Sequence, residues 1–221
     1  MAITKSKYDN FIKKIVKDPD YFSKLDLSIL DKPVNLLMGP NGCGKSQTLK
    51  ALEEKLKKEN ILFIKYSTSN DAQVGTYVND WNRDSDTYEQ GILSAFRSEG
   101  ERMNQLFNVW FEKQALPALL SKETKDKPIR ILIDEADSGL SIDRIMNSLR
   151  GIVTVIVPTE LKKKRDIQFF LTLNSYEMFE ALQSEYTKNI WVPTQEVWSP
   201  KSYEDFSKPY KYYFEKVFKN A

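Results

Sequence analysis

The chain has 221 residues, 41% of them hydrophobic, which is enough to bury a full core, so we expect one domain over residues 1–221. Lys and Arg exceed Asp and Glu by only two, 33 against 31, and this balance gives no reason to expect a polyanionic partner. A single cysteine excludes an intramolecular disulfide framework, and the absence of histidine excludes imidazole bases and imidazole metal ligands.

Hydrophobic periodicity predicts two helices and three strands in the first third of the chain. Apolar residues at helical spacing mark the helices, and alternating or continuous apolar runs mark the strands. The predicted elements are a short helix over 11–16, a half-buried strand over 25–29, a central strand over 34–38, a helix over 46–59 and a strand over 61–66. The order strand, helix, strand over 34–66 suggests a parallel pair joined by a crossover.

The same alternation continues after a polar, loop-dominated stretch at about 67–91. The predicted elements there are an amphipathic helix with its apolar stripe over 103–111, a buried strand over 129–135, a helix over 142–153 and a buried strand over 167–173. Buried strands that alternate with helices predict an α/β fold with a mainly parallel central sheet flanked by helices. The aromatic-rich tail from Trp191 onward gives no clear pattern.

A glycine-rich loop joins the predicted central strand to the next helix. Its sequence, GPNGCGKS, fits the phosphate-binding pattern G-x-x-x-x-G-K-[ST] in the strand-to-helix context that the pattern requires. In such a loop backbone N–H groups cradle the phosphates, the lysine reaches the β- and γ-phosphates, and the hydroxyl holds Mg²⁺. The alternative is a glycine-rich turn without a ligand. The residues assigned to nucleotide are Gly39, Pro40, Asn41, Gly42, Cys43, Gly44, Lys45, Ser46 and Gln47.

Two carboxylates follow the buried strand ILIDE, at the sheet edge where open α/β folds bind ligands. Asp134 is expected to join Ser46 in holding Mg²⁺, and Glu135 to accept a proton from an attacking water, with Lys45 beside the transferred phosphate. A helix N-cap is the other reading of such an acidic pair.

These motifs together resemble the ABC-type P-loop ATPases, in the soluble branch that includes chromosome-maintenance and recombination-repair heads and overcoming-lysogenization-defect ATPases. GPNGCGKS is similar to the first motif of that class, and DEADSGLS resembles its acidic pair followed by a D-loop at 138–141. RSEGE resembles the signature LSGGQ, with Ser98 and Gly100 at the matching places. The resemblance implies ATP and Mg²⁺ as cofactors and a head-to-tail homodimer in which Ser98 and Gly100 contact the γ-phosphate held by the other subunit. Ser98 also fits a capping box with Glu101, a role compatible with phosphate contact.

The resemblance also implies roles for residues outside the three motifs. Asn174 stands near the place of the family's switch histidine, where it would donate a hydrogen bond to the γ-phosphate without carrying charge, so turnover is expected to be slow. A turn or helix-cap role is the alternative for Asn174. Gln73 is a candidate for the glutamine that senses Mg²⁺, and Tyr21 or Phe22 for the aromatic residue that stacks on adenine. Arg97 and Glu99 depart from the signature, which favours a protein with little turnover.

The spacing of the motifs predicts the domain organisation and the partners. The short interval before the signature implies a reduced helical lobe at about 67–116, and residues at about 191–221 form an aromatic-rich extension that either docks a partner or, more in keeping with its composition, folds back on the sheet. The basic run KKKR at 162–165 is either a nucleic-acid contact or a solvated helix end. Cys43 occupies a variable position of the loop and is expected to have no chemistry beyond vulnerability to thiol reagents.

Three functions are consistent with this pattern. The first is an ATPase that dimerises around Mg²⁺·ATP and drives a conformational switch on a protein partner; the second is an ATP-gated clamp or scaffold with little turnover. A P-loop kinase, the third, leaves DEADSGLS without a role. The first residues lack an apolar signal segment and no run of about 18 apolar residues occurs, so a cytoplasmic location without membrane contact is expected.

Overall fold

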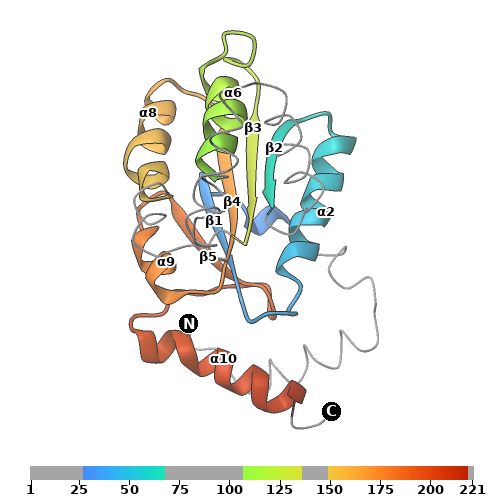
Figure 1. The fold of residues 1–221 in the computed structure, drawn as a ribbon, viewed down its shortest axis with the longest axis vertical. Coiled ribbons are helices and arrows are strands. Elements are labelled where there is room, and N and C mark those ends of the chain that lie inside the picture. Colours follow the sequence, from blue (N-terminus) through green and yellow to red (C-terminus); the bar gives the residue numbers. More distant parts are fainter. Residues whose placement is uncertain (1–26, 68–106, 136–148, 219–221) are drawn as a thin grey trace, which may run out of the picture.

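A six-stranded sheet forms the centre of the computed structural model, which describes residues 27–67, 107–135 and 149–218 (Figure 1). The strands are β1 (Val34–Met38), β2 (Leu62–Ser67), β3 (Ile129–Asp134), β4 (Ile167–Leu173), β5 (Thr187–Trp191) and β6 (Glu196–Val197). Their order across the sheet is β2-β3-β4-β1-β5-β6, and every neighbouring pair is parallel except β5 and β6. The predicted α/β fold with a mainly parallel sheet is confirmed.

Helices cover both faces of this sheet. The helical elements are the 3-10 turn η2 (Leu27–Ile29), α2 (Lys45–Lys58), the π-helical turn η3 (Phe111–Ala115), α6 (Leu116–Leu120), the π-helical turn η4 (Ile152–Ile156), α8 (Val157–Lys162), α9 (Tyr176–Ala181) and α10 (Tyr203–Phe218). α2 and α8 contact β4 from opposite sides, and α10 runs across the lower end of the body (Figure 1). No helix in the described ranges is long and apolar enough to cross a membrane.

The core explains why these segments take these structures. All five residues of β1 are buried and four of them are apolar, which is typical of a strand covered on both faces. On α2 the buried residues Leu49, Leu52 and Leu56 recur at helical spacing and face the sheet. Each fully buried leucine contributes about 1.5–3 kcal/mol relative to an exposed one, so this stripe fixes the helix that follows the glycine-rich loop.

Two sequence-based expectations about the first strands are wrong. In the predicted strand at 25–29, the described residues Leu27–Ile29 form a 3-10 turn, closed by a hydrogen bond of 3.1 Å from Leu30 N to Leu27 O, and Leu30 after it is buried; residues 25 and 26 lie outside the described residues. The strands at 34–38 and 61–66 are parallel members of one sheet but are not neighbours, because β4 and β3 lie between them. The crossover through α2 therefore passes over two strands, β4 and β3.

The helices predicted at 103–111 and 142–153 are confirmed where the structure describes them. Residues 107–110 and 149–151 are helical, and each segment continues through a π-helical turn into α6 or α8. The first parts of both predicted helices, the predicted helix at 11–16 and the stretch at 67–91 lie outside the described residues, apart from Ser67 at the end of β2.

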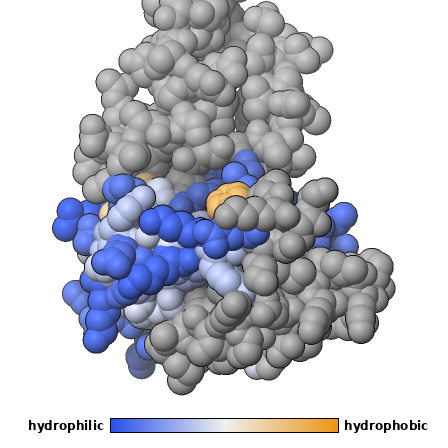
Figure 2. Space-filling view, turned by 90° about the horizontal axis from the view of Figure 1, so that it is seen from below, coloured by the Kyte–Doolittle hydropathy of each residue, from blue (hydrophilic) through white to orange (hydrophobic). Residues whose placement is uncertain are grey.

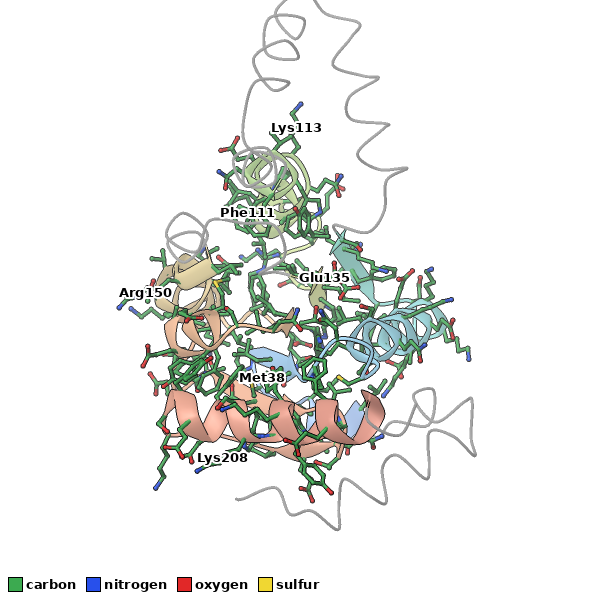
Figure 3. The ribbon with its side chains drawn as sticks, turned by 60° about the horizontal axis from the view of Figure 1, so that its bottom comes forward. Met38, Phe111, Lys113, Glu135, Arg150 and Lys208 are labelled. Atoms are coloured by element: carbon green, nitrogen blue, oxygen red, sulfur yellow. The ribbon has the colours of Figure 1, made fainter. Side chains whose placement is uncertain are left out.

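The tail folds back on the sheet, as its aromatic composition favours. Trp198 and Phe206 are each only 4% exposed, and the Trp191 and Trp198 rings meet edge to face with centroids 4.6 Å apart. The sequence pattern did not predict β5, β6 and α10. Lys208 points away from the body on the outer side of α10 (Figure 3), and most of the described surface seen from below is hydrophilic (Figure 2).

Candidate nucleotide site

The loop after β1 turns sharply into α2 through glycines with positive φ. Gly39, Gly42 and Gly44 have φ of 152°, 77° and 96°, which glycine adopts without the strain that a Cβ brings. At Gly39 a Cβ would lie 2.5 Å from the Sγ of Cys43 and 3.0 Å from the Cδ of Pro193. Gly39 is therefore closely packed between the thiol of Cys43 and Pro193 in the turn that follows β5.

Lys45 folds back over the loop and is only 6% exposed. Its ammonium donates to Gly39 O at 2.6 Å, to Pro40 O at 3.1 Å and to the Oδ1 of Asn174 at 2.8 Å. These three acceptors carry no charge, so an anionic phosphate oxygen is a stronger partner for the ammonium than any of them. The geometry places a cation where an anion can replace neutral partners.

Two carboxyl-bearing residues stand opposite the loop at the end of β3. Asp134 is 4% exposed and accepts hydrogen bonds from Ser46 Oγ at 3.1 Å and from Thr172 Oγ1 at 2.8 Å. Glu135 follows with φ of 53°, an uncommon conformation for a residue with a side chain. The predicted proximity of Ser46 and Asp134 is thus present in the structure, although 88 positions separate them in the sequence.

Thr172 belongs to the same site, and the sequence analysis missed it. Its side chain is fully buried on β4, where it donates to Asp134 and accepts from the backbone N of Glu135 at 2.6 Å. The sequence holds one signal: a hydroxyl interrupts the apolar run IQFFLTL two positions before Asn174, on the side of the strand that Asn174 shares.

A pocket of about 250 Å³ opens between the loop and the acidic pair. It is lined by Asn41, Gly42, Gly44, Lys45, Ser46, Gln47 and Glu135. At about 30 Å³ for each water of the liquid, this volume has room for a group several waters in size, such as a chain of phosphates. In the view of Figure 3, Glu135 lies near the centre, and Met38, the last residue of β1, lies between Glu135 and α10.

The structure describes only part of the predicted site. Tyr21, Phe22, Gln73, Ser98 and Gly100 lie outside the described residues, as do Arg97, Glu99 and the D-loop at 138–141. Their assigned roles stay predictions. Asn174 lies between β4 and α9, while Ser175 is the residue that caps α9, accepting from Met178 N at 3.2 Å. The cap reading of Asn174 is therefore wrong, and its described role is to accept from Lys45.

Cys43 is less accessible than the expected vulnerability to thiol reagents requires. Its side chain is fully buried, and burial raises the pKa of the thiol to about 11. The backbone N of Cys43 donates to Pro40 O at 3.2 Å, so the residue braces the loop from within. The expected vulnerability to thiol reagents is wrong for this buried position.

The basic run at 162–165 is partly structural. Arg165 is only 8% exposed and donates to Glu160 Oε2 at 3.1 Å, to the carbonyl of Leu119, and to Thr124 O at 3.0 Å. Lys163 pairs with the other oxygen of Glu160 at 2.8 Å. Arg165 thus connects the end of α8 to the loop after α6, and a nucleic-acid contact by the run stays a prediction.

Comparison with known families agrees with this geometry. Residues 30–182 match the AAA domain family, and that match covers most of the chain. The chain belongs to the AAA domain family. It is a P-loop NTPase, and the binding and hydrolysis of nucleotide are the general properties that this family supports. No curated protein gives a significant match.

One solved structure that resembles this AAA domain protein is entitled "Structure of C. elegans PCH-2". The identity is 15% and the TM-score 0.31, and the match covers 86% of this chain but 44% of the other. The AAA domain protein described here thus spans less than half the length of that chain. A likeness this distant carries no argument about function.

The oxygen atoms of the AAA domain site suit a small divalent cation. Mg²⁺ takes oxygen ligands, commonly one or two protein groups together with phosphate oxygens and water. Ser46 Oγ and Asp134 Oδ1 lie 3.1 Å apart beside the pocket that would receive the phosphates. These two residues would hold the ion, which would neutralise phosphate charge when bound.

Proposed function

We propose that this chain is a Mg²⁺-dependent ATPase. The observation that carries the proposal is that one pocket edge combines a buried lysine, a hydroxyl–carboxylate pair and a second carboxylate: Lys45, Ser46 with Asp134, and Glu135. A structural glycine turn requires neither a buried ammonium nor two acids across from it. Phosphoryl transfer by a P-loop enzyme uses a lysine on the phosphates, oxygen ligands for Mg²⁺ and a group that orients or deprotonates the nucleophile.

Each group has a role in the proposed reaction. Lys45 exchanges its neutral acceptors for oxygens of the β- and γ-phosphates, and the N-terminus of α2 adds the positive end of its dipole. Glu135 accepts a proton from the water that attacks the γ-phosphate. Asn174, whose Oδ1 lies 2.8 Å from Lys45 Nζ, is close enough to offer its amide to the γ-phosphate once Lys45 moves toward the nucleotide.

The nucleotide is proposed to be enclosed by two copies of the chain facing head to tail, as in the ABC-type ATPases that its motifs resemble. Among the described residues the pocket is lined by the loop, the start of α2 and Glu135. The signature-like segment RSEGE, with Ser98 and Gly100, and the D-loop-like segment at 138–141 are the proposed opposite wall. Dimer formation and release would then move a protein partner.

Glu135→Gln tests both the chemistry and the assembly. The variant keeps the shape of the side chain but cannot take a proton, so phosphate release should fall at least about 100-fold while ATP binding persists. Light scattering with ATP and Mg²⁺ should show a stable dimer of this variant, whereas Lys45→Ala should bind no nucleotide and remain monomeric. Ser98→Arg should bind ATP but fail to dimerise.

The outcomes separate the proposed functions. Hydrolysis by Glu135→Gln at the wild-type rate would remove Glu135 as the base. An ATP-dependent dimer of the wild type that releases no phosphate would identify an ATP-gated clamp instead of an ATPase. A monomer under all conditions would remove the head-to-tail arrangement while leaving hydrolysis by a single chain intact.

A further inference from the structure

One buried hydroxyl connects the two carboxyl-bearing residues of the candidate site. Thr172 Oγ1 donates its proton to Asp134 Oδ1 at 2.8 Å and accepts the backbone N–H of Glu135 at 2.6 Å. A threonine hydroxyl has one proton to give and lone pairs to accept with, so both contacts are satisfied together. Thr172 is fully buried, which shields these bonds from competing water.

The contact with Asp134 directs one carboxylate oxygen. Oδ1 accepts from Thr172 and from Ser46, and the donation from Thr172 holds the carboxylate plane against β4. A carboxylate that is hydrogen-bonded in this way presents a defined edge to a cation, and partners of this kind tune metal affinity without touching the metal. Asp134 lies at the end of β3, next to β4 in the sheet, so the strand register keeps the hydroxyl beside it.

The contact with Glu135 holds an unusual backbone turn. Glu135 has φ of 53°, a conformation that costs a non-glycine residue on the order of 1–2 kcal/mol. A hydrogen bond that fixes the N–H of Glu135 stabilises this turn, which sends its side chain toward the pocket that it lines. Without that bond the turn is free to relax toward ordinary strand geometry and carry the carboxylate away.

We propose that Thr172 is a positioning residue that sets Asp134 for Mg²⁺ and Glu135 for the attacking water at the same time. This inference rests on the proposed ATPase function and adds a residue that contacts neither phosphate nor metal. It predicts that loss of one hydroxyl impairs two steps, Mg²⁺ binding and proton transfer, while nucleotide binding without Mg²⁺ is preserved.

Thr172→Val tests the inference because valine keeps the shape and removes the hydroxyl. The Mg²⁺ concentration that half-saturates binding of a fluorescent ATP analogue should rise about 10–100-fold, and kcat should fall by a similar factor. Affinity for the analogue in EDTA should change less than about threefold. Thr172→Ser should restore both values. Thr187→Val is the matched control, since Thr187 begins β5 at the opposite end of the sheet, paired with Val34.

A second pair of variants guards against a folding defect. Thr172→Ala and Thr172→Ser differ by one oxygen, so a common loss of packing cancels between them. The inference is overturned if Thr172→Val or Thr172→Ala needs no more Mg²⁺ than the serine variant, or if serine is as impaired as valine. Absence of hydrolysis in the wild type would overturn the ATPase proposal alone, because the Mg²⁺ dependence of analogue binding still decides the role of Thr172. Wild-type binding that does not depend on Mg²⁺ would overturn the inference as well.

Discussion

Replacement of Arg165 by methionine should destabilise the fold strongly, although the residue sits in a run of four basic residues. Its guanidinium donates to Glu160 Oε2 at 3.1 Å, to Thr124 O at 3.0 Å, to Thr124 Oγ1 at 3.3 Å and to the carbonyl of Leu119. Methionine preserves much of the apolar stem but leaves these acceptors without their donor. The loop after α6 would lose its tie to the end of α8.

The size of the effect follows from burial. Removing one partner of a buried ion pair costs about 3–5 kcal/mol. Glu160 is 4% exposed but keeps Lys163 at 2.8 Å, so the lower end, about 3 kcal/mol, is expected. For a domain of this size each kcal/mol lowers Tm by about 2–4 °C, which gives a fall of about 6–12 °C.

Thermal unfolding followed by circular dichroism measures this change, with Lys162→Met as the matched control. Lys162 is exposed and begins the same run, so its replacement should alter the free energy of unfolding by no more than about 0.5 kcal/mol. If Arg165→Met lowered Tm by less than about 2 °C, the buried contacts of Arg165 would not stabilise the fold as argued. If Arg165→Met bound DNA more weakly than the wild type while its Tm did not change, Arg165 would be a nucleic-acid contact.

Three further predictions follow from the loop and the core. At pH 8, Cys43 should react with a disulfide reagent about 100-fold more slowly in the folded protein than in urea, because burial raises the pKa of the thiol from 9.0 to about 11. The reaction is followed by absorbance, and equal rates for the folded and the unfolded protein would contradict this. Cys43 and Tyr66, with pKa values raised to about 11 and 12, hold their protons more tightly when folded, so stability against urea should fall as the pH rises above about 9; a rise in stability there would contradict this. Gly39→Ala should abolish binding of a fluorescent nucleotide, because the added Cβ would lie 2.5 Å from Cys43 Sγ, and unchanged affinity would show that the loop tolerates the methyl group.

The parts of the fold that the sequence predicts well are those with a strong local pattern. The run VNLLM is buried at every position, and the stripe of leucines on α2 faces the sheet as its spacing requires. The segment at 25–29 was predicted as a strand because, over so few residues, the spacing of apolar side chains does not distinguish a 3-10 turn from a short strand. A longer segment would distinguish the two periods.

Strand order and the C-terminal segment depend on contacts that are distant in the sequence. Nothing local to 34–66 indicates that β4 and β3 separate β1 from β2. β5 and β6 are formed by TKNIW and the two-residue pair Glu196–Val197, which offer little periodicity to detect. The rings of Trp191, Trp198 and Phe206 pack against one another there, and these contacts join residues that local periodicity does not relate.

The candidate site follows from strand order more than from any single motif. Because β4 lies between β1 and β3, the residues at its carboxyl end stand between the phosphate-binding loop and the acidic pair. Asn174 then accepts from Lys45 of the loop, and Thr172 contacts Asp134 and Glu135 of the acidic pair. A motif search finds the loop and the acids because their letters are distinctive, but it passes over a threonine in an apolar strand. Only the sheet shows that this hydroxyl connects the two acids, and so a strand that carries no recognised motif positions the groups on which metal binding and proton transfer are proposed to depend.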